Sequence, residues 1–175
     1  PGTYIDVKGS PVCKTCPPGT HSKSTGSTAG SVCEECPAGF YSFLGSVSCR
    51  EVPPGSYTNV SSSSDFKVCP PGRYQAMAGQ KLCNVTMPGY YSGSFSAVPL
   101  ACKAGTYNPN MMSTSSDACI PCPLGQFSDV GSSQCADCQG DGMIANSVAS
   151  GCVFDSSALA NSALIDHLFQ GGLAL

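Results

Sequence analysis

A ring-bearing position recurs along this chain at steps of 16–20 residues, and it holds Tyr or Phe in every repeat but one, which holds His. Each ring stands two residues after a glycine that usually follows proline, and a Gly/Ser-rich stretch and a Cys-x-x-Cys couplet come next. Pro-Gly predicts a turn, because proline fixes φ and glycine accepts positive φ. The pattern predicts a short strand through the ring, a turn, and a second short strand into the cysteines. The aromatic slots are Tyr4, His21, Tyr41, Tyr57, Tyr74, Tyr91, Tyr107 and Phe127.

One such two-stranded hairpin is too small to be stable alone, so neighbouring hairpins must stack. We therefore expect a small disulfide-rich, mostly β fold, a linear rod of about eight stacked hairpins. The tandem cysteine-rich repeats occupy residues 1–152, in units of 16–20 residues. The rings are expected to act as packing spacers rather than as ligand-binding groups.

Residues 153–175 form a tail without cysteine that holds five of the nine leucines. Asp155-Ser156-Ser157 resembles an N-cap and Gly171-Gly172 a helix stop, which predicts one short helix over 157–170. That helix is marginal alone and too short to span a membrane. Its anchors are expected to dock on a neighbouring copy, or else to cap the last repeats. The predicted anchors are Leu164, Ile165, Leu168 and Phe169.

Composition explains why cross-links are needed. Leu, Ile, Val and Phe together account for fewer than one residue in five, and the net charge is only −3. Such a chain cannot rely on an ordinary core, and its 13 cysteines supply another source of order. Disulfides persist in oxidising compartments, so we place the chain at the cell surface or outside the cell. The pI near 5.1 argues against nucleic acid as a partner.

The disulfide pairing follows from the missing cysteines. The second slot of a couplet is lost at Val52 together with the first slot of the next couplet, Phe66. Thr86 and Pro99 are lost in the same way. A cysteine that has lost its disulfide partner carries a reactive free thiol. We therefore expect the two cysteines of a disulfide to be replaced together. The predicted pairs are Cys16–Cys33, Cys36–Cys49, Cys69–Cys83, Cys102–Cys119, Cys122–Cys135 and Cys138–Cys152.

Two other readings of the cysteines matter. Cys13-x-x-Cys16 followed by Cys33-x-x-Cys36 also matches a four-thiolate zinc spacing. The loss of half of each neighbouring couplet opposes zinc, so we expect no metal and no other cofactor. Cys13 is left unpaired within the chain, and we expect its partner in a further upstream repeat.

The couplets also resemble a known family. The segments Cys13-Lys-Thr-Cys-Pro-Pro-Gly-Thr-His-Ser, Cys33-Glu-Glu-Cys-Pro-Ala-Gly-Phe-Tyr-Ser and Cys119-Ile-Pro-Cys-Pro-Leu-Gly-Gln-Phe-Ser closely resemble the ephrin-receptor-like cysteine-rich repeat. That repeat is similar in style to growth-factor-like and tumour-necrosis-factor-receptor-like modules. The resemblance covers residues 1 to about 152 and implies an extracellular β-hairpin rod without a catalytic residue. The couplets at 49/52, 66/69, 83/86 and 99/102 depart from it.

Catalytic chemistry finds little support in the sequence. His21 occupies a packing slot and His167 lies in the tail, with no triad-like pattern near either. We therefore expect no enzyme. Asn59-Val60-Ser61 and Asn84-Val85-Thr86 are N-glycosylation sequons, so N-glycans are expected at Asn59 and Asn84.

Two functions remain in view. We favour a structural subunit of an extracellular fibre or surface appendage that assembles with other copies of itself or with another extracellular protein. The alternative is the stalk or ligand-binding ectodomain of a membrane receptor or adhesin.

Overall fold

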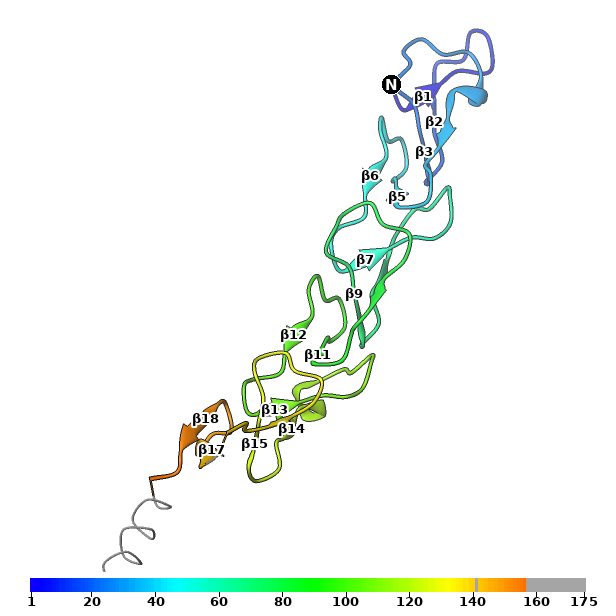
Figure 1. Cartoon of the computed structure of the whole chain (residues 1–175). Coiled ribbons are helices and arrows are strands. Elements are labelled where there is room, and N and C mark those ends of the chain that lie inside the picture. Colours follow the sequence, from blue (N-terminus) through cyan, green and yellow to red (C-terminus); the bar gives the residue numbers. More distant parts are fainter. Residues whose placement is uncertain (141, 157–175) are drawn as a thin grey trace, which may run out of the picture. The chain divides into compact units, whose positions relative to one another are not determined.

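A computed structural model describes residues 1–140 and 142–156. They form a succession of antiparallel two-stranded hairpins (Figure 1). The first five hairpins pair β1 (Thr3–Tyr4) with β2 (Lys14–Thr15), β3 (Thr20–His21) with β4 (Glu34–Glu35), β5 (Phe40–Tyr41) with β6 (Arg50–Glu51), β7 (Ser56–Tyr57) with β8 (Lys67–Val68), and β9 (Arg73–Tyr74) with β10 (Asn84–Val85). The next four pair β11 (Tyr90–Tyr91) with β12 (Leu100–Ala101), β13 (Thr106–Tyr107) with β14 (Ile120–Pro121), β15 (Gln126–Phe127) with β16 (Ala136–Asp137), and β17 (Met143–Ala145) with β18 (Cys152–Phe154).

The disulfide-rich, mostly β class with many two-stranded hairpins is confirmed. The described residues hold one hairpin more than the eight that the aromatic spacing suggests. The ninth escaped the pattern because Ile144 stands in β17 where the others carry a ring. The helix predicted over 157–170 lies outside the described residues, as do the anchors predicted within it.

The chain divides into two compact units. The first comprises Pro1–Met87, Tyr91–Leu100 and Met111–Ser115, and the second comprises Pro88–Tyr90, Ala101–Asn110 and the described residues from Ser116 onward. The units share a plan, because four bonded cysteines of the first (16, 33, 36 and 49) recur 86 residues later as 102, 119, 122 and 135. The 3-10 turn η1 (Gly30–Val32) likewise recurs as η2 (Ser116–Ala118). The second unit therefore provides an internal comparison for the first.

Consecutive hairpins are joined by a repeated backbone hydrogen bond. The glycine two residues before a ring is here called the seat glycine, and seven of the eight donate their N–H to the next hairpin at 2.7–2.9 Å. The acceptor is the carbonyl of the residue directly after the next ring, here called the polar slot. In the first unit these pairs are Gly2 and Ser22, Gly19 and Ser42, Gly39 and Thr58, Gly55 and Gln75, and Gly72 and Ser92. In the second unit they are Gly89 and Asn108, and Gly105 and Ser128.

The polar slot is buried, and sequence reasoning overlooked it. All seven side chains are at most 4% exposed, although they are Ser, Thr, Gln or Asn. Their own N–H groups donate onward to the turn of the following hairpin, at 2.9–3.2 Å. Ser42 also donates its hydroxyl to the carbonyl of Thr20, and Ser128 donates to Thr106 in the same manner. Buried polar atoms are tolerated when they are paired in this way. The sequence does contain a pattern that could have predicted this slot, because a polar residue directly follows almost every ring.

A second repeated contact joins each hairpin to the hairpin two places on. The turn of the later hairpin donates an N–H to the carbonyl of the second-slot residue, at 2.8–2.9 Å, as Gly45 does to Cys16. The same turn presents a carbonyl against the seat glycine of the earlier hairpin. A Cβ at Gly39, where φ is +91°, would overlap the carbonyl oxygen of Gly79. The glycine is therefore needed for both its positive φ and its lack of a side chain.

The seat at Gly125 differs from the seven before it. The other seat glycines are buried against a later turn, whereas Gly125 is exposed. Among residues 1–140 and 142–156, no atom lies within 4 Å of where its Cβ would be. Its φ of +85° nevertheless lies within the range of +70° to +91° that the occupied seats span. The neighbouring Leu124 is fully exposed. This hairpin thus keeps the seat geometry while no described turn covers it.

Gly39→Ala and Gly125→Ala form a matched pair that tests this contact. Both place alanine at a left-handed φ, which costs about 1–2 kcal/mol. Only Gly39→Ala also drives a methyl group into a backbone carbonyl, which adds about 1–3 kcal/mol. We expect Gly39→Ala to lower the free energy of unfolding by about 2 kcal/mol more than Gly125→Ala. Guanidinium unfolding of the oxidised chain, followed by tyrosine fluorescence, measures the difference. Equal losses would contradict the seat contact.

Candidate functional site

The six disulfides each connect one hairpin to the next. The observed pairs are the six that the coupled cysteine losses predict, and their Cα–Cα distances are 5.5–5.8 Å. The second-slot cysteines 16, 36, 69 and 102 are at most 1% exposed. Their N–H groups bond to the seat glycine carbonyls at 2.8–2.9 Å, which fixes each sulfur against the interior of its unit. Covalent and backbone links therefore meet at the same residues.

The cysteines of the four-thiolate zinc reading are engaged differently. Cys16 is bonded to Cys33, and Cys36 is bonded to Cys49. A metal ligand must be a thiolate, and a sulfur in a disulfide is not one. Cys13 is the free cysteine of the described residues, and its side chain is exposed. Its expected upstream partner stays a prediction.

The first lost pair is replaced by packing. Val52 is fully buried in the second slot, and its N–H and carbonyl keep the backbone bonds to Gly39 and Gly79. Phe66, in the first slot, lies edge-on to the ring of Tyr41 at 5.3 Å between centroids. Tyr41 also meets Phe43 edge-on at 5.5 Å. An apolar contact thus stands where a disulfide would be.

An exposed cation completes this aromatic cluster. The guanidinium carbon of Arg50 lies 5.3 Å from the centroid of the Phe43 ring, within cation–π range. Phe43 is about half exposed. At such an exposed site the cation–π contact contributes only about 0.5–1 kcal/mol. The cluster therefore serves chiefly to hold the turn between β5 and β6 against the first-slot ring.

The second lost pair is replaced by a hydrogen bond. Thr86 is fully buried in the second slot, and its hydroxyl bonds the hydroxyl of Ser92, which is also buried. Its backbone N–H and carbonyl keep their bonds to Gly72 and Met112. Pro99, in the partner slot, is half-buried. The backbone pattern is therefore the same with or without sulfur.

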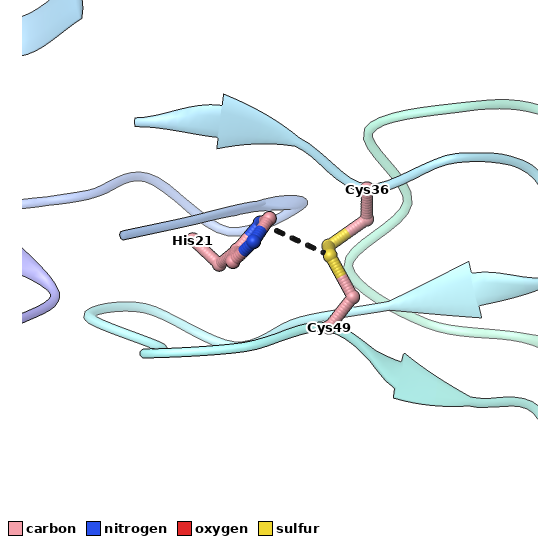
Figure 2. A group of neighbouring side chains, drawn as sticks. All are labelled: His21, Cys36 and Cys49. Atoms are coloured by element: carbon pink, nitrogen blue, oxygen red, sulfur yellow. Dashed lines mark hydrogen bonds between the residues drawn. A yellow bond between two sulfur atoms is a disulfide. The ribbon is translucent and has the colours of Figure 1, made fainter. Parts of the chain in front are cut away.

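His21 is the aromatic slot with distinct chemistry. Its ring lies beside the Cys36–Cys49 disulfide, as Figure 2 shows. Nδ1 is 3.2 Å from the Cys49 sulfur and 3.2 Å from the carbonyl oxygen of Glu34. A carbonyl only accepts hydrogen bonds, so Nδ1 carries the proton in this arrangement. The nitrogen and both sulfurs lie within 4.8 Å of one another, but the two sulfurs are bonded together.

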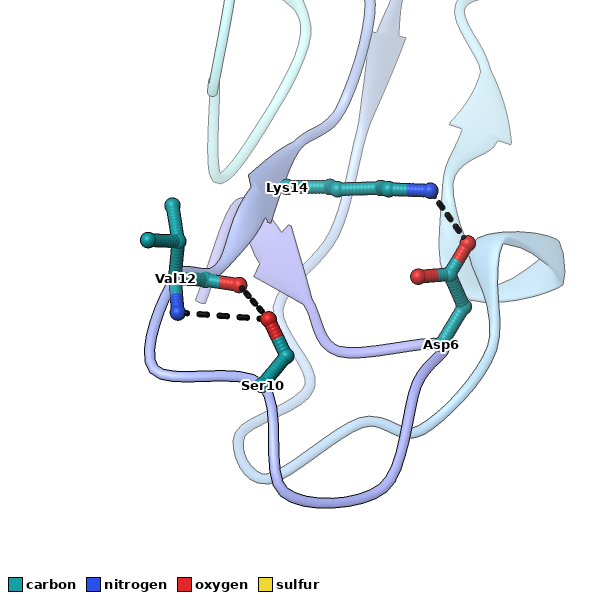
Figure 3. A network of polar contacts seen from close by, with 4 residues as sticks. All are labelled: Asp6, Ser10, Val12 and Lys14. Carbon is teal, nitrogen blue, oxygen red and sulfur yellow. Dashed lines mark hydrogen bonds and ion pairs between the residues drawn. The ribbon is translucent and has the colours of Figure 1, made fainter.

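The loop of the first hairpin holds an ion pair and a hollow. Lys14 donates to the Asp6 carboxylate at 2.6 Å, and the Ser10 hydroxyl closes the loop by bonding Val12 (Figure 3). The hydrogen bond and the charge of Lys14 lower the pKa of the Asp6 carboxyl, and Asp6 raises the pKa of Lys14. Both side chains are exposed, so the pair adds little stability. An open hollow of about 580 Å3 beside them is lined by Tyr4, Lys8 and Cys13 among others.

The remaining sequence-predicted positions lie apart from these features. Every aromatic-slot ring is half-buried within its hairpin, as packing requires. Asn59 is exposed in the loop after β7, with Val60 and Ser61 also exposed. Asn84 is exposed on β10, but the hydroxyl of its sequon belongs to the buried Thr86. The two sequons therefore differ in accessibility. No helix within the described ranges is long and apolar enough to cross a membrane.

Comparison with known proteins places the chain in an extracellular context. No protein-family model matches it. It is similar to the mouse and rat proteins named "Sushi, von Willebrand factor type A, EGF and pentraxin domain-containing protein 1", with 31% identity over 143 residues in both cases. The match covers 78% of this chain but only 4% of each relative. With its six disulfides, this similarity makes the chain a cysteine-rich repeat segment of the extracellular type. The narrower likeness to ephrin-receptor-like repeats stays a prediction.

Restoring the first lost disulfide tests the substitution at Val52 and Phe66. The double variant Val52→Cys, Phe66→Cys should form a seventh bond, because the positions 86 residues later are the bonded Cys138 and Cys152. A loop of this length contributes about 3 kcal/mol, and loss of the Tyr41–Phe66 pair costs about 1 kcal/mol. We expect a net gain of about 2 kcal/mol in guanidinium unfolding.

Mass spectrometry under non-reducing conditions shows whether the bond has formed. Val52→Cys alone should lower stability and leave one free, buried thiol. Two free thiols in the folded double variant would contradict the equivalence of the two slots with a disulfide.

Proposed function

We propose that this chain is a non-catalytic scaffold segment of an extracellular fibre or surface appendage, and that it assembles with further copies of itself. The observation that supports the proposal is the seat contact itself, which recurs at seven glycines and is made by backbone atoms of the hairpin two places on. The contact that fills a seat is made by backbone groups, so it does not require one particular side chain in the incoming turn. A hairpin of another copy can therefore supply it.

Such a contact joins two different surfaces. Because the seat and the turn that fills it belong to different parts of a repeat, successive copies add head to tail. A heterologous contact of this kind gives an open filament when its rotation does not close. Cross-linked hairpins suit this role, since they resist extension without a large core.

A second candidate function is a segment within the ectodomain of a larger multidomain protein. The comparisons favour it, because the similar mouse and rat proteins are far longer and their names give several kinds of domain. In that case the seat at Gly125 receives the next module of the same chain. The receptor stalk or ligand-binding ectodomain belongs to this second candidate.

Assembly of the oxidised full chain tests the first proposal. Sedimentation velocity across a concentration series, with negative-stain electron microscopy, should show linear polymers. Gly125→Ala should abolish them while the monomer stays folded, because its methyl group occupies the place of the incoming carbonyl. Gly26→Ala is the matched control, since Gly26 also has positive φ and open space around it.

Variants of the predicted tail anchors, tested for polymer formation in the same way, form a second part of this experiment. If Leu164→Asp with Leu168→Asp removes polymers, and Leu173→Asp with Leu175→Asp does not, the predicted helix contributes to the copy-to-copy contact. A wild-type chain that stays monomeric throughout the series would contradict self-assembly and leave the ectodomain segment.

We also propose N-glycans at Asn59 and Asn84, added at different stages. A glycosyltransferase must reach both the asparagine and the hydroxyl two residues later. Ser61 is exposed in the folded chain, whereas Thr86 is buried and bonded to Ser92. Asn84 therefore accepts a glycan only before its hairpin folds.

Enzymatic glycosylation of the folded, oxidised chain in vitro checks this order. Peptide mass spectrometry should find the glycan at Asn59 alone, and reduction with unfolding should open Asn84 as well. Modification of Asn84 in the folded chain at the rate of Asn59 would refute the proposed role of Thr86 burial.

A further inference from the structure

The imidazole of His21 singles out one disulfide of the six. The equivalent slot 86 residues later is Tyr107, and the disulfides Cys36–Cys49 and Cys122–Cys135 are equivalent in the same way. Both close a sequence separation of 13 residues. The chain therefore carries two matched disulfides that differ in the ring preceding them.

The position of His21 favours negative charge on the Cys49 sulfur. Nδ1 lies 3.2 Å from that sulfur (Figure 2), and the Glu34 carbonyl oxygen, also at 3.2 Å, keeps the Nδ1–H on this side of the ring. His21 and Cys49 are both half-buried, so water screens the contact only in part. A donor close to a cysteine sulfur stabilises the thiolate over the neutral thiol. In a tyrosine the hydrogen-bond donor is the hydroxyl at the para position. The ring atoms next to Cγ, where histidine has Nδ1, carry no donor in tyrosine.

We propose that Cys36–Cys49 is a thiol–disulfide exchange site for an external dithiol, and that His21 makes it the most readily reduced of the six disulfides. A thiolate of the dithiol attacks the half-buried Cys49 sulfur, and the Cys36 sulfur leaves with the electron pair and takes up a proton. The second thiol of the reductant then attacks its own bonded sulfur. Cys49 leaves as a thiolate that accepts the Nδ1–H hydrogen bond of His21. The dithiol becomes a disulfide, and the protein gains two electrons and one proton, which resides on Cys36 while Cys49 stays a thiolate.

The location gives this exchange a structural consequence. The next cross-link is already missing, because Val52 and Phe66 replace it. Once Cys36–Cys49 opens, no disulfide remains between Cys33 and Cys69. The turn that carries Phe43 and Arg50 then depends on packing and backbone bonds alone. Reduction at this one site would loosen a segment of the first unit while the other five bonds persist.

Redox titration of the full oxidised chain tests the proposal. The chain is equilibrated in buffers of reduced and oxidised dithiothreitol, free thiols are alkylated, and each cysteine peptide is quantified by mass spectrometry. We expect the reduction equilibrium constant of Cys36–Cys49 to exceed that of Cys122–Cys135 about tenfold, which corresponds to about 30 mV. Equal potentials for the two bonds would overturn the proposal.

Exchanging the rings separates the histidine from its surroundings. His21→Tyr should lower the potential of Cys36–Cys49 to that of Cys122–Cys135, and Tyr107→His should raise the potential of Cys122–Cys135. Retention of the other five disulfides and an unchanged circular dichroism spectrum verify the fold of each variant. If Cys36–Cys49 stays the more reducible bond in His21→Tyr, local strain or exposure is the cause and the role of His21 is refuted.

Discussion

The hydrogen bonds of the seat glycines hold this structure together. Seven seat glycines donate their N–H to the next hairpin, accept from the residue that follows their own second strand, and admit a carbonyl from two hairpins on, as Gly39 does with Thr58, Val52 and Gly79. Each bond contributes only about 1 kcal/mol, but the set recurs in seven successive hairpins. It needs a positive φ and an absent side chain at one residue, which is why Gly-x-aromatic is the most regular part of the sequence.

The disulfides act on top of this backbone pattern rather than in place of it. Val52 and Thr86 keep the bonds of the second slot without any sulfur. Their partner slots are filled by Phe66 and Pro99. The first slot of the couplet can therefore hold a cysteine, an aromatic residue or a proline. The cross-links chiefly limit the unfolded chain, which a protein with so few aliphatic residues requires.

Function follows from the same modular contact. A contact made by backbone atoms can be repeated within a chain, between copies, or between modules of a larger protein, and the similarity found here is to a short stretch of a much longer protein. Against this uniform background, individual side chains that depart from the repeat carry the specific chemistry. His21 beside a disulfide and Thr86 inside a sequon are two such departures.

The two-stranded hairpins and all six disulfide pairs could be predicted from the sequence, because coupled cysteine losses at Val52 with Phe66 and Thr86 with Pro99 identify bonded partners. It missed the ninth hairpin, since Ile144 breaks the aromatic pattern. The burial of the polar slots and the contact of His21 with the Cys49 sulfur became visible only in the folded structure. Those features arise from contacts between different hairpins, and the spacing within a repeat carries no information on which atoms of separate repeats come within hydrogen-bonding distance.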